Sequence, residues 1–184
     1  MSGAALIVVD GINDFYDPKG ANYYPEVEST VAPILALLER ARATKTLIVH
    51  AVERHRVGLD DFEWRKLPEH SFIDSFDSRI FEPFAPSGAT HEFELHKRRF
   101  SAFFATDLAL TLREQGVQTV VLAGVKTNVC VRATAQDAFA HGFAVFVPRE
   151  ATNSNRPHLG DASLEDISRY IGRVGPLDEA LVLL

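Results

Sequence analysis

Three side chains that can act together in acyl transfer stand far apart in this chain of 184 residues: Asp10, Lys97 and Cys130, the only cysteine. A thiolate can attack an acyl carbon, while a carboxylate accepts the thiol proton and an ammonium group stabilises both anions. Backbone amides near the thiolate can hold the oxyanion that forms. These residue types together indicate hydrolysis of an amide or a ureide.

Cys130 lies where an apolar run, residues 118–125, passes into a stretch of small residues with a helical pattern. A helix that begins at Thr127 or Asn128, both good N-cap residues, places the sulfur in its first turn. There the helix dipole and free N–H groups favour the thiolate and can bind an oxyanion. On composition alone a small buried core residue is an equal alternative for this cysteine.

Lys97 belongs to a charged Lys-Arg-Arg run that, taken alone, indicates a solvated basic patch. The two-residue period of a strand, however, places Phe93, Leu95 and Lys97 on one face, which predicts that the lysine points inward. A buried lysine needs an anionic partner or a lowered pKa. Asp10 is the natural partner.

Asp10 ends the first apolar run of the chain, residues 4–9. The alternative role for this carboxylate is to cap the turn that follows it. Asp14 and Asp17 lie in the same loop, where we expect them to be exposed turn formers.

The hydrophobic pattern predicts the elements that position these residues. Strands are expected at 4–9, 46–52, 90–98, 119–125 and 143–148, with an edge strand at 173–175. Helices are expected at 24–44, 104–115, 128–141, 159–172 and 177–184, and a short helix near 75–81 within the irregular segment 54–89. This alternation predicts a three-layer α/β fold with a parallel sheet covered by helices on both faces. Ligands of such sheets bind at the carboxyl ends of the strands, where Asp10, Lys97 and Cys130 are expected.

Bulk composition limits the classes of protein that fit. With 46% hydrophobic residues, the chain is expected to form one domain over residues 1–184. A net charge of −6 argues against nucleic-acid binding, and no apolar run is long enough to span a membrane. The start lacks the basic region of a signal peptide, and a single cysteine excludes an internal disulfide, so we expect a cytoplasmic protein.

Four ordered motifs carry a resemblance to a known family: VVDGINDFYDPKG (8–20), KRRFSAFFATDLALTLREQG (97–116), GVKTNVCVRATAQDAFAHGF (124–143) and PREAT (148–152). Together they cover most of the chain and resemble the isochorismatase-like cysteine hydrolases. The resemblance implies an open six-stranded parallel sheet of order 3-2-1-4-5-6 and a dimer or tetramer. It also implies a catalytic triad of Asp10, Lys97 and Cys130, an oxyanion hole from the backbone N–H groups of Lys126 and Cys130, and a cis Val125–Lys126 peptide bond.

The sequence also departs from the family pattern. Ile12 stands where the family commonly has glutamine. The nicotinamidase branch binds a divalent metal through an Asp-x-His pair and a further histidine. His50 and His55 are present here, but the Asp-x-His pair is missing, so we expect no metal and no cofactor.

The resemblance is strongest to hydrolases of ureido and carbamoyl compounds, which implies a small-molecule amide or ureido substrate. Phe15, Phe100 and Phe103 are expected as pocket walls, although each is equally expected in the core. A substrate carboxylate is expected to meet residues that can otherwise lie at the surface or at a subunit contact: Arg54, Arg56, Trp64 and Arg98. The alternatives are a nicotinamidase-type amidase and a non-catalytic binding protein on the same fold. The irregular segment 54–89 is expected to set specificity.

Overall fold

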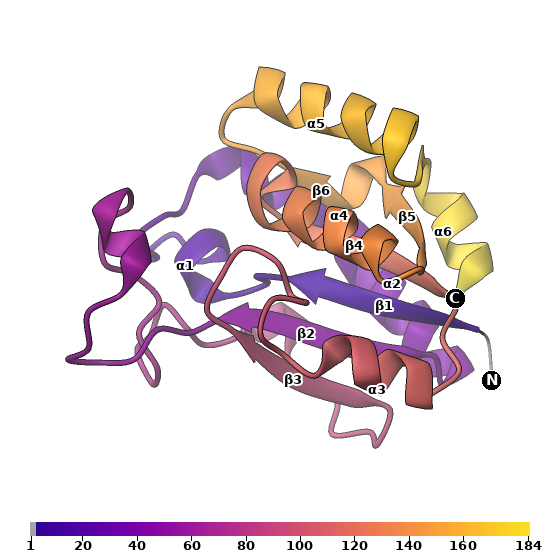
Figure 1. Ribbon diagram of the computed structural model, residues 1–184, viewed down its shortest axis with the longest axis horizontal. Coiled ribbons are helices and arrows are strands. Elements are labelled where there is room, and N and C mark those ends of the chain that lie inside the picture. The colour runs from indigo at the N-terminus through magenta and orange to yellow at the C-terminus, as the bar shows by residue number, and fades with distance from the viewer. Residues whose placement is uncertain (1–2) are drawn as a thin grey trace.

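The computed structural model describes residues 3–184 and shows a parallel sheet between two layers of helices (Figure 1). The described residues form a seven-stranded sheet whose main path has the order β3-β2-β1-β4-β5-β7, while β6 pairs with β4. The strands are β1 (Ala4–Val9), β2 (Leu47–Glu53), β3 (Glu92–Lys97), β4 (Thr119–Val125), β5 (Ala144–Pro148), β6 (Thr152–Asn153) and β7 (Arg173–Gly175). The predicted fold class and strand order are therefore confirmed, and the short β6 is an addition to them.

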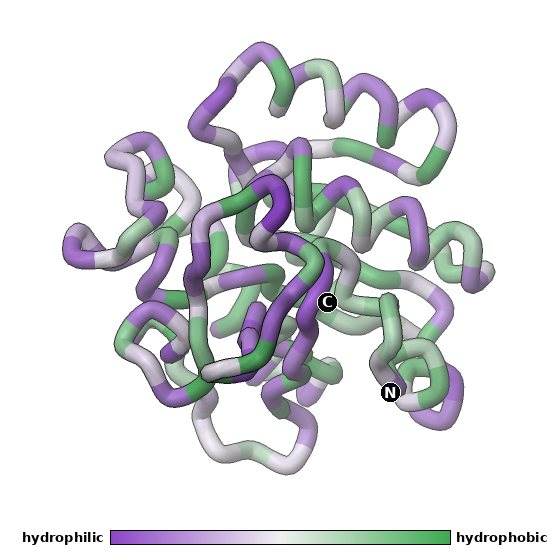
Figure 2. Tube along the Cα trace, turned by 60° about the vertical axis from the view of Figure 1, so that its left-hand side comes forward, coloured by the Kyte–Doolittle hydropathy of each residue, from purple (hydrophilic) through white to green (hydrophobic). Residues whose placement is uncertain are grey.

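Helices cover both faces of the sheet. On one face, α3 (Leu108–Glu114), α4 (Arg132–Ala140) and α5 (Pro157–Tyr170) share a core with Ala5, Ile7 and Val9 of β1. On the other face, α2 (Val31–Thr44) and α6 (Leu177–Leu183) share a core with Leu6 and Val8. Because alternate residues of one strand enter opposite cores, β1 reads as a continuous apolar run. Along α5 the hydropathy alternates as expected for a helix with one buried face (Figure 2).

Short helical segments complete the chain. They are α1 (Asn13–Tyr16), the 3₁₀ turns Pro25–Thr30, Phe62–Arg65, Glu82–Phe84 and Arg149–Ala151, and a π-helical turn at Thr127–Val131. Among the described residues, no helix is both long and apolar enough to cross a membrane.

Two predicted helical segments are wrong. Residues 75–81 form turns, because the backbone N–H groups of Asn13 and Asp14 bind carbonyl oxygens in that segment and dock it against α1. The helix expected from residue 104 begins only at Leu108. Ala105 has a left-handed φ of 54°, which breaks the helical path before that point.

The strand order reverses at β1, which lies between β2 and β4. At the carboxyl end of these strands the backbones of β1 and β4 approach very closely. Gly124 has a φ of 104°, and a Cβ at this position would lie 2.0 Å from the Val9 carbonyl oxygen. Only glycine fits there, and the close approach brings the turn after β4 next to the end of β1.

Candidate active site

The structure brings the three predicted catalytic side chains together at the carboxyl end of the sheet. Lys97 Nζ lies 2.8 Å from Asp10 Oδ2 and 3.7 Å from Cys130 Sγ. Lys97, Asp10 and Cys130 are all buried. Asp10 Oδ1 also accepts a hydrogen bond of 2.9 Å from the backbone N–H of Glu53. The ammonium group thus touches both the carboxylate and the sulfur.

Burial and the neighbouring charges set the protonation of this group. Burial raises the pKa of Asp10 to about 6, although the Lys97 ammonium opposes the rise. Burial also works against the charge of Lys97, but Asp10 and Cys130 outweigh it and raise the pKa of the amine. The charged Asp10–Lys97 pair is therefore the favoured state near neutral pH.

The protonation of the Cys130 thiol differs from the sequence-based expectation, which favoured the thiolate. Burial raises the pKa of Cys130 well above its ordinary value, although Lys97 opposes this shift and Asp10 reinforces it. The resting group is thus a neutral thiol beside an ion pair, because desolvation outweighs the helix terminus that was expected to favour the thiolate.

The turn that carries Cys130 is fixed by its own hydrogen bonds. Thr127 Oγ1 lies 2.8 Å from Thr152 Oγ1, and Asn128 Oδ1 accepts a hydrogen bond of 2.6 Å from Ser154. The prediction that Thr127 or Asn128 is the N-cap is wrong, because Lys126 holds that position, without a side-chain hydrogen bond. The Lys126 carbonyl oxygen accepts from the N–H groups of Val129 and Val131, so Lys126 and Cys130 belong to one rigid turn. The Val125–Lys126 peptide bond is cis.

Cys130 opens onto a cavity of about 510 Å³, a size suited to a small molecule. Phe15 and Phe100 line this cavity, as expected. Phe103 was expected there too, but it lies in the core against Phe143, with ring centroids 5.9 Å apart. Lys126, which was expected at the site only through its backbone N–H, lines the cavity as well. Further lining residues were not predicted: Asn22, Glu53, Leu67, Pro68, His70, Asn128, Val129, Arg132 and Ala133.

None of the four side chains expected to meet a substrate carboxylate lines this cavity. Arg54, Arg56 and Arg98 line a separate cleft, where Arg54 pairs with Glu94 at 2.8 Å. Trp64 packs its ring against His55 instead, at 4.5 Å between centroids.

Two residues of the segment after β1, Asp14 and Ile12, are buried, and neither lines the cavity. Asp14 is fully buried rather than exposed, because its carboxylate accepts hydrogen bonds from Asn22 and Ser71. Ile12 is buried in the core and pairs with Ile80 through a backbone bridge.

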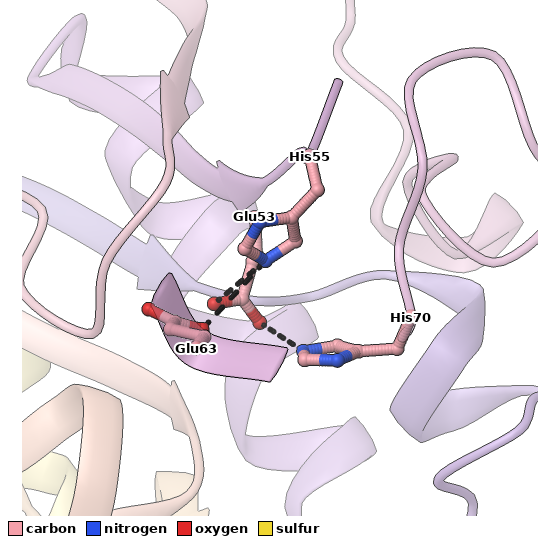
Figure 3. Close-up of side chains that lie close together, drawn as sticks. All are labelled: Glu53, His55, Glu63 and His70. Carbon is pink, nitrogen blue, oxygen red and sulfur yellow. Dashed lines mark hydrogen bonds and ion pairs between the residues drawn. The ribbon is translucent and has the colours of Figure 1, made fainter. Parts of the chain in front are cut away.

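Beside the three predicted catalytic residues lies a cluster of four possible metal ligands, Glu53, His55, Glu63 and His70, whose ligand atoms all fall within 4.8 Å of one another (Figure 3). His55 Nε2 lies 3.7 Å from an oxygen of each glutamate, and His70 Nε2 lies 3.1 Å from Glu53 Oε2. Among the described residues, four of these buried atoms have no hydrogen-bond partner: His55 Nε2, Glu53 Oε1 and both carboxylate oxygens of Glu63. Histidine nitrogens and carboxylate oxygens with free lone pairs suit a divalent transition metal such as Zn²⁺.

The surroundings of this cluster orient its histidines. His55 Nδ1 lies 3.0 Å from Asp61 Oδ2, a contact that fixes the ring and leaves Nε2 facing the glutamates. Burial opposes protonation of His70, but Glu53 outweighs it and raises the pKa of this imidazole to about 9. Without a metal, His70 therefore carries the positive charge that balances Glu53.

Sequence reasoning overlooked this cluster because it searched for an aspartate. Glu53-x-His55 supplies a carboxylate and a histidine at the same spacing as an Asp-x-His pair. His50, the other histidine considered, is bound to Glu92 at 2.8 Å and takes no part. The expectation that no metal binds stays a prediction, to be tested by titration.

The fold and this site together define a class of hydrolase. The Isochorismatase domain model matches residues 4–179, so the chain belongs to the isochorismatase family. It is 37% identical to maleamate amidohydrolase of Pseudomonas putida over 182 residues, which are 96% of this chain and 84% of the relative.

Solved structures agree with this assignment. An isochorismatase-like hydrolase from Alkaliphilus metalliredigens superposes with a TM-score of 0.89 at 33% identity, over 97% of both chains. A pyrazinamidase of Pyrococcus horikoshii in complex with zinc superposes with a TM-score of 0.84 at 30% identity, over 95% of this chain and 99% of the other. The chain is an isochorismatase-family amidohydrolase acting on non-peptide C–N bonds.

Proposed function

We propose that this protein is a cysteine-dependent hydrolase that cleaves a C–N bond of a small amide or of a ureido or carbamoyl compound through a thioester-type intermediate. One observation carries the proposal: the Lys97 ammonium lies 3.7 Å from Cys130 Sγ and 2.8 Å from Asp10 Oδ2, and Cys130 lines a cavity of about 510 Å³. A nucleophile, a base and a cation are thereby in mutual reach of a bound substrate.

In the first half-reaction, the Cys130 thiol passes its proton to the Asp10 carboxylate while the sulfur attacks the substrate carbonyl carbon. The S–C bond forms, and the negative charge moves to the carbonyl oxygen, which in this proposal accepts hydrogen bonds from the backbone N–H groups of Lys126 and Cys130. Asp10 then gives the proton to the leaving nitrogen, the C–N bond breaks, and ammonia or an amine departs. Lys97 stabilises the thiolate and the carboxylate as their charges change.

In the second half-reaction, water attacks the acyl or carbamoyl group on Cys130. Asp10, again a carboxylate, accepts a proton from this water, and the S–C bond breaks to release the acid. The proton returns to the sulfur, so the resting thiol and the Asp10–Lys97 pair are restored. The net reaction consumes one water and needs no redox partner.

The pH dependence of kcat/KM tests this order of proton transfers. Because Asp10 must be a carboxylate to accept the thiol proton and its pKa is about 6, we expect kcat/KM to fall as the pH drops through 6. Below that pH the fall is about tenfold per unit, as for a single proton. Ammonia release across the pH range measures this limb, and circular dichroism at each pH checks that the fold persists.

A different profile contradicts the mechanism. If a thiolate had to form before substrate binds, the limb would lie above the ordinary cysteine range, since burial raises the pKa of Cys130. A limb in that alkaline region, with no change in rate near pH 6, excludes Asp10 as the proton acceptor.

A nicotinamidase-type amidase is a second candidate, favoured by the cluster of Glu53, His55, Glu63 and His70. A divalent ion held by these residues would supply positive charge at the cavity wall, because Glu53 and His70 also line the cavity. The zinc in the pyrazinamidase structure supports this candidate by analogy.

Titration of the chelator-treated protein with Zn²⁺ tests the cluster. The nicotinamidase candidate predicts that one ion binds per chain and that His55→Ala weakens binding by about 100-fold or more, since a ligand is lost; the expectation of no metal predicts no binding. His96→Ala is the matched control, because His96 is exposed and outside the cluster. Binding that is absent, or that His55→Ala leaves unchanged, contradicts the nicotinamidase candidate. The cysteine mechanism is unaffected by that result.

A further inference from the structure

The cavity that holds Cys130 is lined by three side chains that can carry positive charge, and two of them already have anionic or carbonyl partners. Arg132 binds Asp166 through both Nε and a terminal nitrogen. His70 uses Nε2 on Glu53 and Nδ1 on the Pro68 carbonyl oxygen. Lys126 is different, since no hydrogen bond or ion pair among residues 3–184 involves its ammonium group.

The Lys126 side chain lies over aromatic rings instead. Its Nζ lies 5.3 Å from the ring centroid of Phe15 and 5.7 Å from that of Tyr24. Tyr24 is held in place by a hydrogen bond of 2.6 Å from its hydroxyl to Asn153. Ring faces attract a cation but satisfy none of its three N–H donors, so the ammonium keeps its capacity to bind an anion.

The position of Lys126 connects this free cation to the reaction centre. Lys126 is the N-cap of the rigid turn that carries Cys130. Burial lowers the pKa of its amine, while the nearby Cys130 and Asp14 oppose that shift. A half-buried cation without a counter-ion gains more from an anionic ligand than a solvated one does.

We propose that the Lys126 ammonium binds a carboxylate of the substrate, and that the substrate is therefore an amide or ureide bearing a carboxylate close to the reacting carbonyl. This inference rests on the proposed cysteine mechanism and adds a substrate class to it. In this arrangement the backbone N–H of Lys126 donates a hydrogen bond to the oxyanion, and its side-chain ammonium pairs with the carboxylate of the substrate. The preference separates acid amides, such as the monoamide of a short dicarboxylic acid, from neutral amides of the same size.

A matched pair of substrates tests the inference: maleic acid monoamide, which carries a carboxylate, and maleic acid diamide, which does not. In the unmodified protein we expect kcat/KM for the monoamide to exceed that for the diamide by about 100-fold, as for a charged hydrogen bond to a desolvated partner. Lys126→Met keeps the aliphatic stem and removes the charge, so the ratio should fall to near one. Lys126→Arg should retain most of the preference.

Lys45→Met is the control for loss of a lysine charge, because Lys45 is exposed and lies just before the amino end of β2, at the opposite edge of the sheet. It should keep the ratio of the unmodified protein. A purely structural role for Lys126 would lower both kcat/KM values by the same factor in Lys126→Met, which would overturn the inference. Equal turnover of the two amides by the unmodified protein would overturn it as well.

Binding of the same two amides to the Cys130→Ala variant gives the comparison without turnover. In Cys130→Ala we expect the monoamide to bind more tightly than the diamide. Adding Lys126→Met should remove this difference in affinity. Equal affinities for the two amides in Cys130→Ala count against the inference. Failure of the proposed function has a different signature, namely that Cys130→Ala still hydrolyses either amide.

Discussion

Replacing Cys130 with alanine is expected to lower kcat for the best amide substrate by about 10⁴-fold or more, with little change in the fold. The sulfur is the only thiol in the chain and the atom that forms the bond to the acyl carbon in the proposed mechanism. Alanine removes one buried atom and leaves the neighbouring Asp10–Lys97 pair intact at 2.8 Å. Steady-state ammonia release measures the loss.

The fold of this variant is checked by circular dichroism and by urea unfolding, where we expect a change of about 1 kcal/mol. Cys130→Ser gives a further comparison, because it keeps a hydroxyl nucleophile of similar size but much lower acidity. An alanine variant that folds normally and retains more than a small fraction of the original kcat would rule out covalent catalysis by this residue.

Replacing Asp10 with asparagine is expected to affect both activity and stability. The proton acceptor is lost, so kcat should fall by about 10³-fold or more. Among residues 3–184, Lys97 would then keep only Glu53 Oε1, at 3.9 Å, as a charged partner in its buried position. Breaking a buried ion pair from one side costs about 3–5 kcal/mol, which urea unfolding should detect as a lower midpoint with an unchanged slope.

The double variant Asp10→Asn and Lys97→Met separates these two effects. Removing both charges leaves no uncompensated buried ion, so most of the lost stability should return, while activity should not. Two single variants that each cost less than about 1 kcal/mol would contradict the buried pair. Recovery of turnover in the double variant would contradict its role in proton transfer.

The convergence of Asp10, Lys97 and Cys130 was predictable because the positions of these residues depend on regular structure. The two-residue period of β3 turned Lys97 inward, and the apolar runs of β1 and β4 placed Asp10 and Cys130 at the same edge of the sheet. In a parallel sheet the carboxyl ends of neighbouring strands meet, so residues distant in sequence converge. The charge state of the thiol was not predictable, because it depends on desolvation in the folded state.

The rest of the site depends on segments without a repeating pattern. His70 reaches Glu53 from the irregular segment 54–89, whose path is set by long-range contacts such as the hydrogen bond of 2.9 Å between Ser71 and Asp14. Phe103 and Phe100 are both aromatic and close in sequence, yet one is buried in the core and the other lines the cavity. No period distinguishes them, because residues 101–107 form turns rather than a helix.

Intact-protein mass spectrometry after acid quench during turnover tests the central claim most directly. With an amide or ureide substrate, we expect a fraction of the protein to gain the mass of the acyl or carbamoyl group, on the peptide that contains Cys130. The Cys130→Ala variant should gain no mass under the same conditions. Two results would contradict the account. One is turnover without any adduct on the unmodified protein, even when a thiol-directed electrophile that resembles the amide is supplied. The other is an adduct on a different residue.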